Sequence, residues 1–384
     1  MNYKKIYYTD DLEDQLRIGK ALRMMYDSDQ ERYVRGILDK LANLEEIGLS
    51  RDDLYHRSIY DYWAYGFSPD QEIYLGTCKK SHEEKSQYIS WKERFLFWAR
   101  LNRWDDMWML EDKYEAYKLL KPYYKRELIK ILTDEDYPQF LSFIDRHPVF
   151  VVKPLGLSLS MGVRKIDADQ YSDKKALFNE LLHVADEFRG DYSIEKSDFN
   201  GAVLEELIVQ EKQFGAIHPD SVNAVRITTI RKGGGIMMFY PWIKVGFNHS
   251  FVASAGQGGF NAGIDQNTGQ VNTDGYMEDG KTLAVHPDSG IAFKSLVMPE
   301  WQAAVEMTKE ISLNLPSSIN YVGWDLVYTD KGWLIMEGNY YGDMMWQMFL
   351  ERGTKKEFGD LIGWQMNPEK PFWWQYNAKA LENK

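Results

Sequence analysis

The stretch Asn320 to Asp343, NYVGWDLVYTDKGWLIMEGNYYGD, constrains the fold of this chain more than any other. Two apolar runs, Tyr321–Tyr328 and Trp333–Met336, flank Asp330-Lys331-Gly332, a combination that is typical of a turn. Apolar runs on both sides of a short turn predict a β-hairpin. The stretch is therefore expected to form two antiparallel strands.

A three-residue turn would place Thr329 opposite Trp333 and, four residues further back, Asp325 opposite Glu337. Directly opposed residues in a sheet have Cβ atoms roughly 5 Å apart. Asn339 shares the face of Glu337 because side chains alternate along a strand. The hairpin therefore predicts two carboxylates and an amide close together.

Opposed acids with apolar neighbours need a positive partner, because burying an uncompensated carboxylate costs free energy. A hard divalent cation such as Mg²⁺ suits two carboxylates and an amide, and it completes its shell with phosphate oxygens and water. The alternative is a hairpin at a sheet edge whose acidic face is only solvated.

The charge balance argues against nucleic acid as a main partner. The 384 residues include 58 Asp and Glu against 46 Lys and Arg, a net charge of −12, whereas phosphate backbones bind basic surfaces. An acidic protein can still bind a polyanion such as ATP through a local basic pocket and a metal. Cys78 is the only cysteine, which excludes an intrachain disulfide and a Cys-rich zinc site.

Neither a secretory signal nor a membrane span is predicted. Residues 1–15 contain no apolar h-region, and no apolar run approaches the ~20 residues that span a bilayer. We therefore expect a cytoplasmic protein without membrane insertion.

The hydrophobic pattern predicts both helices and strands, distributed unevenly along the chain. Residues 1–100 are expected to form a helical N-terminal region whose many aromatic side chains fill a core. Residues 101–350 mix helical and strand patterns, with a Gly- and Asn-rich loop at 246–274 that is long enough to be a lid. Residues 351–384 are expected to form a helical tail that packs on the body.

Lys153 is the first candidate for binding phosphate. It follows a predicted buried strand, Val149–Val152, and precedes the glycine- and serine-rich turn Gly156–Gly162. An ammonium group, small residues and backbone amides together suit a phosphate group. The alternative is a plain hairpin turn with a surface lysine. Lys113, at the start of a predicted helix, is a weaker candidate because most helix lysines are solvated.

Three further segments admit a functional and a structural interpretation. Glu205-Glu206-Leu207-Ile208 is predicted to link two lobes and to present backbone groups to a purine, or to be an edge strand with outward glutamates. Arg226, central in an alternating strand, is either ion-paired or faces an anionic cleft. His218 beside Pro219 favours a structural turn over acid–base chemistry. The tetrapeptide His-Pro-Asp-Ser recurs at 286–289, which we interpret as turn composition.

The order of these features resembles the ATP-grasp superfamily, in which two α+β lobes clamp ATP. The resemblance implies an α+β ATP-grasp domain over residues 101–350, with a hinge near 203–210 that binds adenine. It also implies a metal site for Mg²⁺ or Mn²⁺ made by Asp325, Glu337 and Asn339. Gln210 and Glu211 are the candidates for the ribose. The residues implied for ATP binding are Lys113, Lys153, Ser158, Ser160, Met161, Gly162, Glu205, Glu206, Leu207, Ile208 and Gln210.

The resemblance narrows to the sugar-transfer-associated branch, also described as α-L-glutamate ligase-related, over roughly residues 60–350. It rests on the segments His218–Arg226 and Gln257–Asp265 together with the acidic hairpin. The substrate residues that this implies are His218, Ser221, Asn223, Gly258, Gly259 and Asn261.

By resemblance the protein is expected to be an ATP- and magnesium-dependent carboxylate–amine ligase. An acyl phosphate would form and an amine would then displace phosphate, with Arg226 and Lys153 as catalytic residues. The implied partners are small-molecule acids and amines, and sugar-transfer enzymes of cell-surface polysaccharide synthesis. The alternatives are a small-molecule or sugar kinase and a non-catalytic, nucleotide-binding partner of a glycosyltransferase.

Overall fold

The computed structural model describes residues 8–155, 160–186, 201–253, 258–342 and 344–364. The chain divides into two compact units. Unit 1 comprises Met1–Arg100, Asp274–Leu283 and Asp343–Lys384, and unit 2 comprises Leu101–Thr273 and Ala284–Gly342. The predicted α+β class with a helical N-terminal region is confirmed. Among the residues described, no helix has the length and apolar character that crossing a membrane requires.

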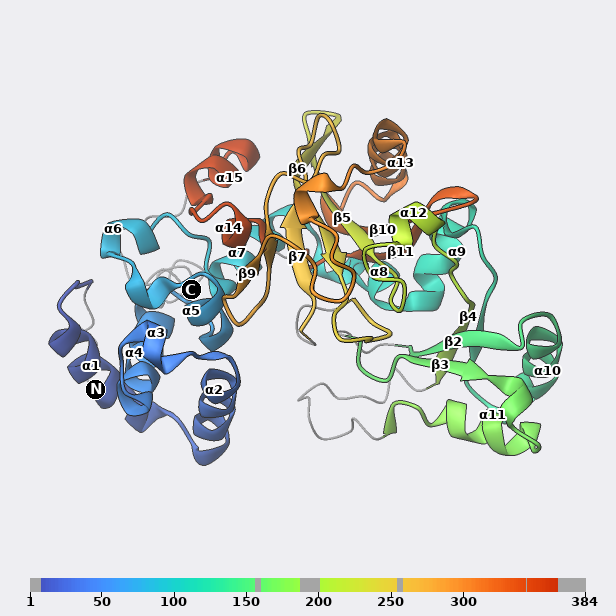
Figure 1. The fold of residues 1–384 in the computed structure, drawn as a ribbon, viewed down its shortest axis with the longest axis horizontal. Helices are drawn as coiled ribbons and strands as arrows, with labels where there is room; N and C mark the ends of the chain where they lie inside the picture. Colours follow the sequence, from blue (N-terminus) through green and yellow to red (C-terminus); the bar gives the residue numbers. More distant parts are fainter. Residues whose placement is uncertain (1–7, 156–159, 187–200, 254–257, 343, 365–384) are drawn as a thin grey trace. The chain divides into compact units, whose positions relative to one another are not determined.

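Unit 1 is mostly helical (Figure 1). Gly19 lets its first and fourth helices approach closely, because an added Cβ would lie 1.9 Å from the carbonyl oxygen of His56. The aromatic residues Phe67, Phe97 and Trp98 are buried, as expected of core side chains. The helices and short strands of unit 1 are α1 Leu12–Leu22, α2 Ser28–Leu41, α3 Leu44–Ile47, α4 Arg51–Ala64, α5 Pro69–Tyr74, α6 His82–Lys85, α7 Trp91–Leu101, α14 Trp346–Phe349, α15 Lys355–Ile362, β8 Gly275–Tyr276 and β9 Thr282–Leu283.

Unit 2 contains a smaller sheet of four antiparallel strands in the order β1-β4-β2-β3. Two helices pack on it, as Figure 1 shows, and Phe140, Phe143, Phe150 and Phe178 lie in the core between them and the strands. The strands are β1 Leu128–Ile131, β2 Val149–Pro154, β3 Arg164–Asp167 and β4 Ala202–Glu206, and the helices are α10 Tyr137–Arg146 and α11 Lys174–Leu182.

Within unit 2 the larger sheet has the order β11-β10-β5-β6-β7. Helix α13 packs on it, and the Trp324 indole N–H donates to Ser312 of that helix at 3.0 Å. The strands are β5 Ala224–Lys232, β6 Gly235–Val245, β7 Phe260–Gly263, β10 Tyr321–Thr329 and β11 Gly332–Asn339, and the helices of this unit not yet named are α8 Trp108–Glu111, α9 Lys113–Tyr124, α12 Lys212–Gly215 and α13 Trp301–Asn314.

The 246–274 segment is not a loop throughout, contrary to expectation. Phe260–Gly263 forms strand β7, which pairs with β6 through the registers Lys244↔Asn261 and Trp242↔Gly263. The strand has four residues, all of them buried, so it shows no alternation of apolar and polar residues that would distinguish it from the glycine-rich sequence around it. A turn follows in which the Asp265 carboxylate accepts hydrogen bonds from the backbone.

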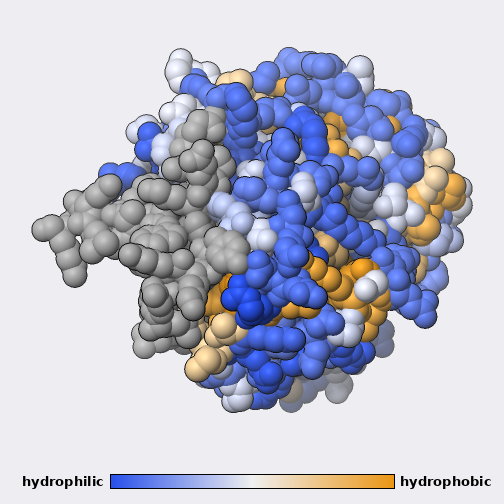
Figure 2. All heavy atoms as spheres, turned by 90° about the vertical axis from the view of Figure 1, so that its left-hand side faces the viewer, coloured by the Kyte–Doolittle hydropathy of each residue, from blue (hydrophilic) through white to orange (hydrophobic). Residues whose placement is uncertain are grey.

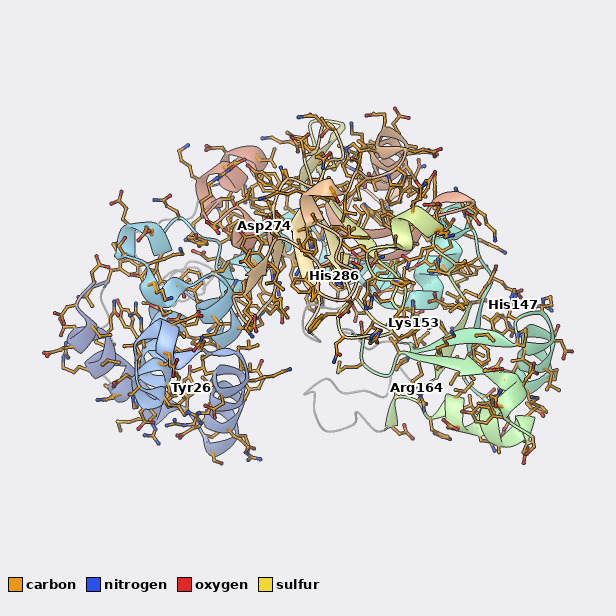
Figure 3. The ribbon with its side chains drawn as sticks, viewed as in Figure 1. Tyr26, His147, Lys153, Arg164, Asp274 and His286 are labelled. Atoms are coloured by element: carbon orange, nitrogen blue, oxygen red, sulfur yellow. The ribbon has the colours of Figure 1, made fainter. Side chains whose placement is uncertain are left out.

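On the face of the molecule that Figure 2 presents, the coloured residues are mostly hydrophilic. Many of the candidate side chains come from the two sheets of unit 2, whereas Lys113 begins helix α9. Lys153 projects from the end of β2, where Figure 3 labels it.

Candidate functional site

The turn between β10 and β11 is one residue shorter than the sequence predicts. Thr329 pairs with Gly332, so Asp330-Lys331 alone forms the loop, and the predicted Thr329–Trp333 pairing is wrong. The side chain of Thr329 closes this turn, because it accepts a hydrogen bond from the Lys331 N–H and donates one to the Gly332 carbonyl. The shorter loop shifts the register of the whole hairpin by one residue.

A β-bulge cancels that shift. Leu326 pairs with Ile335, but the next pair is Asp325 with Glu337, so Met336 is the extra residue on β11. The predicted opposition of Asp325 and Glu337 is therefore confirmed, for a reason that the sequence analysis did not contain.

Asn339 joins the two acids. Its side-chain Nδ2 lies 3.3 Å from Asp325 Oδ2 and 3.1 Å from Glu337 Oε1. One oxygen of each carboxylate thus lies within hydrogen-bond distance of the same atom, Asn339 Nδ2. The placement of amide oxygen and nitrogen is assigned from hydrogen bonding, so a rotated Asn339 would turn its oxygen to the same point.

The donor set fits Mg²⁺. Among the described residues no group of three or more His, Cys, Asp or Glu side chains could hold a metal ion, so a site here has only two acids and an amide. Mg²⁺ commonly takes one or two carboxylates and fills its octahedral shell with water and phosphate oxygens. The convergence of Asp325, Glu337 and Asn339 meets that requirement, whereas a cation that needs an all-protein cage would find too few ligands.

Asp325 is compensated by two cations. Arg226 reaches it with Nε at 2.5 Å from Oδ1 and Nη2 at 2.9 Å from Oδ2, and Lys244 Nζ lies 3.0 Å from Oδ2. Burial alone would raise the pKa of Asp325, which is 4% exposed, but Arg226 and Lys244 outweigh burial and hold this pKa well below its ordinary range. Of the two interpretations of Arg226, the structure shows the ion pair.

Sequence reasoning did not identify Lys244. It lies near the end of β6, and its register partners are Ala224 on β5 and Asn261 on β7. The one available signal is a lysine between the apolar residues Ile243 and Val245, which are both buried.

Lys153 and Glu205 form an ion pair of 2.9 Å on the smaller sheet. Arg126 holds the other carboxylate oxygen of Glu205, with Nη2 at 2.8 Å and Nε at 3.1 Å. Glu205 is 3% exposed, and although burial would raise its pKa, the charges of Lys153 and Arg126 lower the pKa from 4.5 to about 2. Strand β4 lies between β1 and β2, so the interpretation of an edge strand with outward glutamates is wrong for Glu205.

Lys113 is close enough to Glu337 and to Lys153 for both charges to affect its pKa. Its Nζ donates to the Leu155 carbonyl at 3.4 Å. Burial lowers the pKa of Lys113, the charge of Glu337 opposes this effect, and the charge of Lys153 adds to it. The charges of Glu337 and Lys153, both predicted site residues, therefore act on Lys113 in opposite directions.

The glycine-rich turn is described in part. Ser158 lies outside the described residues. Ser160 and Gly162 have left-handed φ values of 58° and 68°, and Met161 between them is half-buried. The backbone therefore turns sharply here, and phosphate binding by this turn stays a prediction.

After β4 ends at Glu206, the chain crosses to the larger sheet. Leu207 and Ile208 are half-buried, and the Glu211 N–H then donates to the Tyr328 carbonyl of β10 at 2.9 Å. The predicted link between two sheets lies in this segment. Glu206 accepts from the Glu127 N–H at 2.9 Å.

Both candidates for the ribose have other partners. The Gln210 side chain donates to the Ser221 carbonyl at 2.7 Å and accepts from the Asn223 N–H at 3.0 Å. Glu211 caps α12 by accepting from the N–H groups of Gln213 and Phe214, each at 2.9 Å. We therefore assign neither residue to the ribose.

The two His-Pro-Asp-Ser copies are more than turn composition. His218 Nδ1 lies 2.8 Å from Ser221 Oγ, and His286 Nδ1 lies 3.5 Å from Ser289 Oγ, so the copies repeat one contact. The two histidine rings are 5.6 Å apart, and His218 Nε2 is 3.5 Å from Asp288 Oδ2. His218 and His286 are fully buried and Ser221 nearly so, and burial lowers the pKa of His218. Figure 3 labels His286 beside the larger sheet.

The other predicted substrate residues lie around β7. Gly258 has a left-handed φ of 87°, and Gly259 follows it before the strand begins. Asn261 is 3% exposed, and among the described residues its Nδ2 has no hydrogen-bond partner. Its register neighbour is Lys244, which holds Asp325. Asn223, in contrast, is buried with hydrogen-bond partners in the protein.

A family model described as sugar-transfer associated ATP-grasp matches residues 96–360 of the chain. No curated protein matches the chain.

Solved structures resemble the chain only distantly. D-alanyl-alanine synthetase A from Vibrio cholerae has 11% identity and a TM-score of 0.37, with 66% of this chain and 64% of that one covered. D-alanine-D-alanine ligase from Helicobacter pylori has 14% identity and a TM-score of 0.38, with 65% and 59% covered. N5-carboxyaminoimidazole synthetase from Staphylococcus aureus, complexed with ADP, has 11% identity and a TM-score of 0.38, with 64% and 48% covered. The chain thus spans less than two thirds of each of these structures.

Proposed function

Because the chain belongs to the sugar-transfer-associated ATP-grasp family and has its fold, we propose that it is an ATP- and magnesium-dependent carboxylate–amine ligase. The observation that carries the proposal is the convergence of Asp325 and Glu337 on Asn339. Lys113 and Lys153, which belong to the same unit, supply positive charge for phosphates.

The nucleotide would be held from the smaller sheet. Lys153 is fixed by Glu205, and an ammonium group has three donors, so it can also reach a phosphate oxygen. Lys113 would add a second positive charge. Backbone groups of Glu206, Leu207 and Ile208 would face the adenine, and Ser158, Ser160, Met161 and Gly162 the phosphates.

The metal would be held by Asp325, Glu337 and Asn339. Bound Mg²⁺ (or Mn²⁺) would neutralise phosphate charge and orient the terminal phosphoryl group. Arg226 and Lys244 keep the Asp325 oxygens in place. We propose that the charge of Arg226 also stabilises the transferring phosphoryl group.

The reaction would have two steps. A substrate carboxylate oxygen attacks the terminal phosphorus of ATP, and the bond to ADP breaks to give an acyl phosphate. An amine then attacks the acyl carbon, phosphate leaves, and the nitrogen loses a proton to give the amide. Exclusion of water protects the acyl phosphate from hydrolysis.

The substrates are proposed by class only. They are a small acid and an amine. We also propose a cytoplasmic role beside sugar-transfer enzymes in cell-surface polysaccharide synthesis; of this, the family description supports the association with sugar transfer. His218, Ser221 and Asn223 are buried and would shape the substrate region from behind, whereas Gly258, Gly259 and Asn261 lie around β7.

An ADP-release screen tests the proposal. Pairs of amino acids, sugar acids and amines are supplied with ATP and Mg²⁺, and product masses are measured. An amide product supports the ligase. A phosphorylated product without an amide identifies the kinase instead. Nucleotide binding without ADP release from any pair favours the non-catalytic partner of a glycosyltransferase.

A further inference from the structure

Arg126 connects the two sheets of unit 2. It is buried just before β1, and its guanidinium group binds Glu205 on the smaller sheet. The same group donates from Nη1 to the Ile335 carbonyl at 2.6 Å and from Nη2 to the Met336 carbonyl at 3.2 Å, both on β11. One side chain thus spans a carboxylate and two successive backbone carbonyls.

Those two carbonyls lie at the β-bulge. A bulge leaves its extra residue outside the ladder, and buried carbonyl groups without a partner cost free energy. Arg126 donates to the carbonyl of the extra residue, Met336, and to that of Ile335 just before it. The next residue is Glu337, whose position opposite Asp325 depends on the bulge.

The same guanidinium group also acts on Lys153, through Glu205. Glu205 accepts from Arg126 through Oε2 and pairs with Lys153 through Oε1. A continuous series of contacts therefore runs from Lys153 through Glu205 and Arg126 to the bulge beside Glu337.

We propose that Arg126 is a positioning residue that couples nucleotide binding at Lys153 to metal binding at Glu337. This inference rests on the proposed function, because it requires that ATP and Mg²⁺ bind in unit 2. Specifically, Arg126 holds strand β11, which carries Glu337, in the register that suits a nucleotide already bound at Lys153.

The test uses Arg126→Lys in the full chain. Lysine keeps a positive charge near Glu205 but lacks the planar fork that reaches the two carbonyls as well. The matched control is Arg231→Lys. Arg231 also donates hydrogen bonds to backbone carbonyls in unit 2, from Nη1 to Pro316 at 3.2 Å and from Nη2 to Leu315 at 2.9 Å. These contacts do not involve Asp325 or Glu337.

The measurement is the dissociation constant of ATP by calorimetry, with Mg²⁺ and with EDTA. The ratio of the two constants is the coupling between metal and nucleotide. We expect Arg126→Lys to reduce this ratio by about tenfold, within the usual range of coupling between sites, while metal-free ATP binding changes little. The melting temperature should fall, because the carbonyls of Ile335 and Met336 lose their donor. Arg231→Lys should leave the ratio unchanged.

The outcomes are distinct. Absence of ATP binding by the wild-type chain overturns the proposed function itself. A wild-type ratio that Arg126→Lys preserves overturns the role of Arg126 alone, including the case in which both constants weaken equally, as a purely structural role predicts. If Arg126→Lys does not fold, deletion of Met336 removes the bulge from the other side. An unchanged ratio in that variant also overturns the proposal.

Discussion

Asp325 lies directly opposite Glu337 across β10 and β11, with Asn339 hydrogen-bonded to both. Asp325 is the more deeply buried acid and is held by Arg226 and Lys244. The two acids therefore have different roles in the fold. Asp325 is part of a buried charge network, whereas Glu337 is half-buried.

Asp325→Asn should destabilise the protein. The substitution removes the negative charge that Arg226 and Lys244 share, and loss of one partner from a buried ion pair costs about 3–5 kcal/mol. Urea unfolding measures this change in free energy. Glu337→Gln is the matched control, and we expect it to change the unfolding free energy by less than about 1 kcal/mol. Equal effects of the two substitutions would contradict this difference in roles.

Two buried asparagines should respond in opposite ways to leucine. Asn102, 4% exposed, donates to the carbonyls of Tyr321 and Tyr340 and accepts from the N–H groups of Asn320 and Tyr321.

Asn102→Leu removes the hydrogen bond that Asn102 makes to each of those four groups, so we expect a loss of about 3 kcal/mol or more. Asn261→Leu removes a buried Nδ2 that has no partner among the described residues, so stability should stay the same or rise. Turnover in the ADP-release assay should nevertheless fall for Asn261→Leu if that nitrogen serves the substrate. Unfolding curves measure the stability of both variants, and ADP release measures their turnover. A strongly destabilised Asn261→Leu variant would refute the expected difference in stability.

Glu205 should make stability depend on pH in the acid range. Its pKa in the folded state is lowered from 4.5 to about 2. The unfolded chain therefore binds the proton first as pH falls. The stabilisation is complete above about pH 4.5, is lost as pH falls towards 2, and amounts to about 3 kcal/mol.

Unfolding free energies of the wild type and of Glu205→Gln, measured from pH 6 to pH 3, isolate this contribution. Other titrating groups contribute equally to both proteins, so the difference in unfolding free energy reports Glu205. This difference should shrink as the pH falls, because protonation of Glu205 removes its contribution. A difference that stays constant with pH would show that Glu205 does not contribute in this way.

Gly246→Ala should disturb the paired histidine turns. A Cβ at Gly246 would lie 2.4 Å from Ser221 Oγ and 2.6 Å from His218 Nδ1, and both side chains are buried. Overpacking of this kind costs about 1–3 kcal/mol. Gly235→Ala at the other end of β6 is the control, because its Cβ would meet nothing closer than 3.8 Å. Thermal melting distinguishes the two variants, and equal melting temperatures would contradict the close approach.

The acidic hairpin could be predicted because its information is local. Alternating apolar runs on both sides of a turn define the strands, and the opposition of Asp325 and Glu337 followed from counting. The count succeeded because two unpredicted features compensate: a loop one residue shorter and an extra residue, Met336, in the bulge. Neither feature leaves a clear signal in residue types alone.

The network around the acids could not be predicted, because it depends on contacts between distant segments. Arg126 and Glu205 are 79 residues apart, and Arg126 and Ile335 are 209 apart. Nothing in the residues beside Arg126 indicates a bulge so far along the chain. The sequence shows His-Pro-Asp-Ser twice, which we interpreted as turn composition, and only the fold shows that the two histidine rings lie 5.6 Å apart.

The central claim is that the opposed acids hold a divalent cation together with a nucleotide. Titration of Mn²⁺ into the protein with ATP, followed by electron paramagnetic resonance of the free ion, tests it most directly. Saturable Mn²⁺ binding that requires ATP is expected for the wild type, and Glu337→Gln should weaken it by at least about tenfold, because the metal loses a charged ligand. Mn²⁺ binding that is absent, or equally strong in Glu337→Gln, would contradict the claim.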